Sequence, residues 1–92
     1  MMPEKSWSVE LSKSAIKALA HLEKTAAIRI LDRLEELGRT ENPLRHKDVR
    51  SLDGKLKGFY RFRVGEYRVI IELDTENRRI GVLAIVPRGQ GY

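Results

Sequence analysis

The spacing of apolar residues changes after Gly58, and this change constrains the fold more than any other feature. Over residues 60–64 and 67–73 apolar side chains occupy alternate positions, which is the pattern of strands with one buried face. Only Gly65-Glu66 separates the two runs. A glycine at the first position of a two-residue loop supplies the positive φ of a type II′ turn. We therefore expect an antiparallel hairpin.

The register of this hairpin gathers arginines on one face of the predicted sheet. A two-residue loop places Val64 opposite Tyr67 and Arg63 opposite Arg68. Arg61 lies one step further along the same face. Like charges directly opposite each other destabilise a sheet, whereas a phosphate between two guanidinium groups removes the repulsion and accepts bidentate hydrogen bonds. The pattern favours an anion site over a basic face that is merely solvated.

The N-terminal part of the chain has a strand pattern followed by helical spacing. Residues 7–11 alternate in the manner of a short strand, and Ser12 can cap the helix that follows. We expect a helical hairpin next, with its second helix over Thr25–Leu37 and Gly38 as the stop signal. The two apolar stripes are Ala15, Ile16, Leu19 and Leu22, then Ala27, Ile30 or Leu31, Leu34 and Leu37.

The remaining segments complete an α+β domain over residues 1–92. Residues 39–57 contain turn signals and are expected to form a connecting loop, with His46 exposed to solvent. Residues 81–86 form a last strand that is apolar on both faces, with Val82, Ala84 and Val86 on its outer side. The predicted order is an N-terminal strand, a helical hairpin and a three-strand antiparallel meander, with the helices packed on one face.

Composition limits the classes of function. The chain has 92 residues and a formal net charge of +5, and residues 47–92 carry ten basic against six acidic side chains, a net of +4. Such a basic half favours nucleic acid, an anionic membrane or an acidic protein as partner. Cysteine is absent and only His21 and His46 are present, so we expect neither a metal site nor a thiol nucleophile. No apolar run approaches the ~18 residues of a membrane helix, and no signal peptide is recognisable.

A set of short motifs resembles the RelE/ParE toxin superfamily. In chain order these are a leucine–glycine loop, a basic alternating strand, a Tyr-Arg pair opening the next strand, an apolar last strand and a closing arginine and tyrosine. They correspond to Leu52-Asp53-Gly54, Tyr60–Val64, Gly65–Ile70, Val82–Val86, Arg88 and Tyr92. The resemblance implies a RelE-like fold. RelE-type members are ribosome-dependent endoribonucleases that cut mRNA in the ribosomal A site and inhibit translation, and ParE-type members act on DNA gyrase.

The resemblance also implies roles for individual residues. It assigns phosphate binding and catalysis to Arg61, Arg63, Arg68, Arg88 and Tyr92. It assigns docking on ribosomal RNA to the basic residues Lys47, Arg50, Lys55 and Lys57. An arginine stays protonated because its pKa exceeds ~12, so none of these arginines is expected to act as a general base. No metal or other cofactor is expected.

The implied partners are a cognate antitoxin, which neutralises the toxin in a hetero-oligomer, together with the ribosome and mRNA. No membrane partner is expected, and the expected location is the cytoplasm. Two alternatives stay open at this point. The chain is a gyrase inhibitor of the ParE type, or it is a relative whose only partner is its antitoxin.

Overall fold

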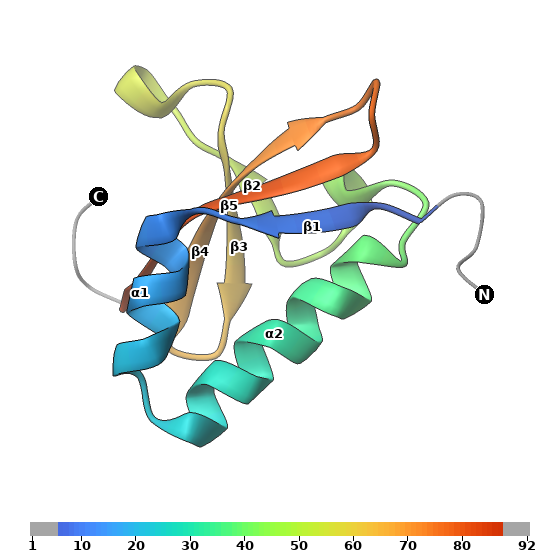
Figure 1. Cartoon of the computed structure of the whole chain (residues 1–92). Coiled ribbons are helices and arrows are strands. Elements are labelled where there is room, and N and C mark those ends of the chain that lie inside the picture. Colours follow the sequence, from blue (N-terminus) through green and yellow to red (C-terminus); the bar gives the residue numbers. More distant parts are fainter. Residues whose placement is uncertain (1–5, 88–92) are drawn as a thin grey trace.

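The computed structural model describes residues 6–87 and shows two helices packed on one face of a five-stranded sheet (Figure 1). Along the sheet the strands follow the order β1-β5-β4-β3-β2. β1 runs parallel to β5, and every other neighbouring pair is antiparallel. The elements are β1 (Ser8–Leu11), α1 (Lys13–His21), α2 (Lys24–Gly38), β2 (Val49–Ser51), β3 (Tyr60–Val64), β4 (Tyr67–Asp74) and β5 (Arg79–Pro87), with short 3-10 turns η1 (Pro43–Arg45) and η2 (Gly54–Leu56).

The α+β prediction is confirmed, and the sheet has one strand more than expected. β2 lies inside the segment predicted to be a loop, and it pairs with β3 from Val49 opposite Phe62 to Ser51 opposite Tyr60. Its three residues are too few for an alternating pattern to stand out in the sequence. β5 lies between β1 and β4, which explains why its sequence is apolar on both faces.

α1 begins as predicted and α2 begins one residue earlier than predicted, at Lys24, but the packing faces of both helices are narrower. Ser12 caps α1, because its Oγ accepts a hydrogen bond from the Ala15 amide at 3.0 Å. Ile30 of α2 is fully buried. Ile16, which the first stripe predicted to be buried, is 54% exposed, and Leu31, the alternative to Ile30 in the second stripe, is 44% exposed. Each of these two residues directly follows a fully buried residue. Successive side chains of a helix are rotated by about 100°, so the second side chain of each pair points away from the sheet.

Gly38 allows a close approach of α2 to the first residues of the β1 segment. Its carbonyl accepts a hydrogen bond from the Trp7 amide at 2.6 Å. A Cβ on Gly38 would lie 2.9 Å from the Trp7 carbonyl oxygen. Gly38 is not among the glycines with positive φ, and the C-cap is Arg39 in a right-handed conformation. α2 therefore ends at Gly38 as predicted, and the close contact with Trp7 explains why this position holds a glycine.

A β-bulge changes which side chains of β5 face the core. The pairing with β4 passes from Ile70 opposite Ala84 to Ile71 opposite Val82, and Leu83 is left without a partner in the register. Val82 consequently joins the core and is 1% exposed. The prediction that Val82 shares the outer side with Ala84 is therefore wrong, because strict alternation does not cross a bulge.

We expect Gly38→Ala to destabilise the domain. Alanine would gain about 0.5–1 kcal/mol from helix propensity, but the added Cβ meets backbone, and overpacking of this kind costs about 1–3 kcal/mol. Thermal unfolding followed by circular dichroism should show a fall in Tm of several degrees. Gly81→Ala is the matched control, because its Cβ meets only the flexible side chain of Glu72. Equal Tm values for wild type and Gly38→Ala would contradict this explanation.

Candidate functional site

The β3–β4 hairpin has the predicted turn and register. Gly65 has φ +56°, as the first position of a type II′ turn requires. Val64 lies opposite Tyr67, and Arg63 lies opposite Arg68. Phe62 and Val64 are buried in the core beneath the helices. Side chains alternate along a strand, so the arginines of this hairpin lie on the face away from the helices.

β2 adds a further arginine to this face. Arg50 lies directly opposite Arg61, one row away from the Arg63–Arg68 pair. We call the resulting set of Arg50, Arg61, Arg63 and Arg68 the arginine surface. Arg50 was predicted only as a basic residue that docks on RNA, and the pairing places it beside the predicted catalytic residues. The sequence around Arg50 did not indicate this position, because a strand of three residues is too short to show an alternating pattern.

Two adjacent hollows lie on the arginine surface. One, of about 140 Å³, is lined by Arg61, Arg63, Gly65, Tyr67 and Arg68. The other, of about 100 Å³, is lined by Lys47, Asp48, Arg50, Arg61 and Arg63. Arg61 and Arg63 line both, so the surface is continuous.

The other predicted site residues have different positions. Lys47 joins the arginine surface through the second hollow. Lys55 lies in η2 and Lys57 directly follows it; both are exposed, and neither lines these hollows. Arg88 and Tyr92 lie outside the described residues.

Within residues 6–87, no carboxylate forms an ion pair with Arg50, Arg61 or Arg63. Among the described residues, the Arg50 guanidinium donates to backbone carbonyls, those of Lys47 at 3.1 Å and Val49 at 3.3 Å. Arg61 Nε is buried and has no hydrogen-bond partner in this part of the chain. Elsewhere in the described part of the chain, carboxylates pair with Arg33, Arg39 and Arg79. These three arginines therefore keep donors for an anion.

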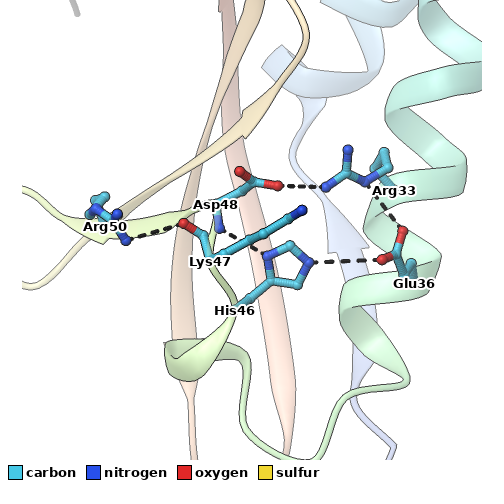
Figure 2. A network of polar contacts seen from close by, with 6 residues as sticks. All are labelled: Arg33, Glu36, His46, Lys47, Asp48 and Arg50. Atoms are coloured by element: carbon cyan, nitrogen blue, oxygen red, sulfur yellow. Dashed lines mark hydrogen bonds and ion pairs between the residues drawn. The ribbon is translucent and has the colours of Figure 1, made fainter.

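Behind the edge of this surface, a polar network joins α2 to the segment before β2 (Figure 2). Arg33 donates to the Asp48 carboxylate at 2.8 Å and pairs with Glu36 at 3.2 Å. The Asp48 amide donates to His46 Nδ1 at 3.1 Å. His46 Nε2 lies 3.9 Å from Glu36 Oε1. The His46 side chain is only 10% exposed and meets the Phe62 ring edge-on, so the prediction of a solvent-exposed histidine is wrong.

The environment of Asp48 favours its charged form. Partial burial would by itself raise the pKa of the Asp48 carboxyl, but the hydrogen bond and charge of Arg33, with His46 and Lys47 nearby, lower it. The pKa of Asp74, at the other end of the sheet, is lowered by hydrogen bonds from Asn77 and by Arg79. Both carboxylates therefore hold their arginine partners at neutral pH.

Neither a ligand cluster for a metal nor a membrane span occurs in the described part of the chain. Among residues 6–87, no group of three or more histidine, cysteine, aspartate and glutamate side chains is placed to hold a metal ion. None of the helices there combines the length and the apolar character needed to cross a membrane.

The sequence and the fold are similar to known toxins. The family model described as the ParE toxin of the type II toxin–antitoxin system, parDE, matches residues 9–92. The archaeal RelE–RelB complex from Pyrococcus horikoshii OT3 contains a similar chain with 32% identity and a TM-score of 0.75, covering 94% of this chain and 99% of that one. A search of the curated proteins found no match.

More distant structures share the fold. The RelBE2 toxin–antitoxin complex from Mycobacterium tuberculosis has a TM-score of 0.78 at 20% identity, covering 90% of this chain and 99% of that one. The isolated E. coli RelE toxin has a TM-score of 0.71 at 16% identity, covering 94% of this chain and 88% of that one. At these identities the likeness concerns the arrangement of helices and strands.

We expect acid to remove the contribution of Asp48 to stability. A lowered folded pKa means that the stabilisation is complete above the usual value near 3.8 and is lost as pH falls through the folded pKa. Thermal unfolding between pH 7 and pH 2 should give a higher Tm for wild type than for Asp48→Asn at neutral pH, and this difference should shrink below pH ~4. A difference that stays constant down to the lowest pH would show that the Asp48 charge contributes nothing.

Proposed function

Because the chain belongs to the ParE toxin family of type II toxin–antitoxin systems, we propose that it is a toxin that cleaves mRNA in the ribosomal A site and so inhibits translation. The observation that carries this proposal is the arginine surface, which presents donors to an anion on an open sheet face. Planar guanidinium groups can bind the oxygens of a phosphodiester bidentately. The 32% identity to an archaeal RelE chain adds support.

The proposed reaction is a transfer within the RNA strand. The ribose 2′-oxygen attacks the adjacent phosphorus, and the bond from phosphorus to the 5′-oxygen breaks, which leaves a cyclic phosphate and a 5′-hydroxyl. The 2′-hydroxyl loses a proton and the leaving 5′-oxygen gains one. Arg61, Arg63 and Arg68 donate hydrogen bonds to the phosphate oxygens as their charge increases, which is usually the largest catalytic contribution. Being permanently protonated, they do not take the proton from the 2′-hydroxyl.

The remaining assignments follow the same chemistry. Arg88 would stabilise the leaving oxygen, and Tyr92 would stack on the substrate base; both rest on the family resemblance. Lys47 and Arg50 line the second hollow, so we assign them to the RNA backbone next to the scissile phosphate. Lys55 and Lys57 dock on ribosomal RNA, and the ribosome orients the substrate that this small domain cannot enclose.

Inhibition of DNA gyrase is the second candidate function, because the family model that matches the chain is that of the ParE toxin. The two functions predict different products from the same purified protein. An mRNA-cleaving toxin gives fixed 5′ ends in primer extension on programmed ribosomes and leaves gyrase active. A gyrase inhibitor leaves the mRNA intact and blocks supercoiling.

We further propose a cognate antitoxin as partner, in a cytoplasmic toxin–antitoxin hetero-oligomer. Two of the similar structures are complexes described as toxin–antitoxin or RelE–RelB pairs. The net charge of +5 suits an acidic partner. An amphipathic segment would also cover the large apolar side chains that α1 and α2 leave exposed, which are Ile16, Ile28 and Leu31.

We expect Arg68→Ala to lower ribosome-dependent cleavage by about 10²–10³-fold, the usual loss when one donor to transition-state charge is removed. The fold should persist, because the Arg68 side chain lies on the face opposite the core and its loss leaves no core cavity. Primer extension and Tm are measured on the same preparation. Arg39→Ala is the control, since Arg39 pairs with Glu35 on the exposed side of α2. A Tm lowered by several degrees with near-normal cleavage would place Arg68 in the scaffold instead.

Binding of the antitoxin should stabilise the toxin and stop cleavage. A ligand at a hundred times its Kd adds about 2.7 kcal/mol to the free energy of unfolding. Mixing purified toxin with its antitoxin should therefore raise the Tm by several degrees and abolish the primer-extension products. If a complex forms while Tm and cleavage stay unchanged, the antitoxin does not cover the arginine surface.

A further inference from the structure

Asp48 contacts three separate parts of the fold through three different groups. Its carboxylate accepts a hydrogen bond from Arg33 of α2 at 2.8 Å. Its amide donates to His46 Nδ1 at 3.1 Å, and its carbonyl accepts from the Arg63 amide of β3 at 2.9 Å. Figure 2 shows the first two contacts, with the carboxylate directed toward α2. The residue thus joins the helix layer to the sheet edge that carries the arginine surface.

The contact with Arg63 extends the β2–β3 pairing by one step. β2 has only three residues, so its place beside β3 depends on the bonds at its two ends. At one end the Leu52 amide donates to the Phe59 carbonyl at 3.0 Å. At the other end the Asp48 carbonyl accepts a hydrogen bond from the Arg63 amide. A shift of Asp48 would therefore move both Arg63 and the β2 segment that carries Arg50.

The same network packs against Phe62, which lies between Arg61 and Arg63 in the sequence of β3. The Arg33 guanidinium is 5.6 Å from the centre of the Phe62 ring, and His46 is 5.4 Å from it edge-on. Phe62 is fully buried. The arginines on either side of it project from the opposite face of the strand. Packing on one face of β3 thus supports the position of the arginines on the other face.

We propose that Asp48, oriented by Arg33, is a positioning residue of the arginine surface. It holds β2 against β3 so that Arg50, which contacts the neighbouring RNA backbone, stays beside Arg61 and Arg63, which contact the scissile phosphate. The inference rests on the proposed cleavage of mRNA for its substrate. Asp48 is the only carboxylate among the residues that line the second hollow. Its hydrogen bond with Arg33 gives that negative charge a partner in α2.

Asp48→Asn removes the carboxylate and keeps the backbone contacts possible. Misplacement of reacting groups by about 1 Å can reduce a rate by ~10²-fold, so we expect kcat for ribosome-dependent cleavage to fall by about ten- to a hundredfold with little change in KM. Hydrogen exchange of the Arg63 amide should become faster. Asp74→Asn is the matched control, because it also removes an Arg-paired aspartate, at 3.0 Å from Arg79 at the far end of the sheet. It should leave both measurements unchanged.

Arg33→Gln provides a second and independent test. It leaves the Asp48 carboxylate without its helix partner, beside Arg61 and Arg63, where it would compete with the substrate phosphate. Arg33→Gln should therefore reduce cleavage at least as much as Asp48→Asn, and the double variant should recover part of the loss. A purely structural pair would show no recovery when Asp48→Asn is added.

The outcomes separate the inference from the proposed function. The inference would be overturned if Asp48→Asn cleaved mRNA at the wild-type rate and its Arg63 amide exchanged at the wild-type rate. The inference would also be overturned if the pH–rate profile of Asp48→Asn lost its acid limb, because Asp48 would then be a general base. If the wild type arrests growth without cutting mRNA, the proposed function fails. Loss of growth arrest together with faster Arg63 exchange in Asp48→Asn, but not in Asp74→Asn, would then still support positioning.

Discussion

Gly65 adopts a φ of +56°, and the two-residue turn that it permits sets the register of β3 against β4. This register has two consequences at once. It places Phe62, Val64 and Val69 in the core, and it leaves Arg63 opposite Arg68 on the other face. A slip of one residue would bury arginines and expose the core. Formation of the core and placement of the candidate site therefore depend on the same constraint.

The distribution of ion pairs complements this arrangement. In the described region, carboxylates pair with arginines along α2 and at the far end of the sheet, where Asp74 lies 3.0 Å from Arg79. None pairs with Arg50 or Arg61, which face each other across β2 and β3. Repulsion between directly opposed like charges costs roughly 0.2–1 kcal/mol. The domain tolerates this cost at the face where an anion can bind, which is consistent with a functional surface.

His46 and Asp48 show how a segment outside regular structure can belong to the framework of a site. They lie between η1 and β2, in a stretch rich in charge. Composition alone suggests solvent exposure there. Instead, the His46 side chain is 10% exposed, and it packs with Arg33 around Phe62. The polar groups are accommodated because each finds a partner, as buried polar atoms generally must.

The sequence alone determined the elements whose signals are local. Alternating apolar residues and a glycine-containing two-residue turn predict the hairpin, its register and the shared face of Arg61, Arg63 and Arg68, because the turn and strands are contiguous in the chain. Tertiary structure decided the rest. The pairing of β2 with β3, the bulge at Leu83 and the Arg33–Asp48 contact each join segments whose meeting depends on the packing of the whole domain. Arg50 joins the arginine surface only through that pairing, and no periodicity in a three-residue strand could reveal it.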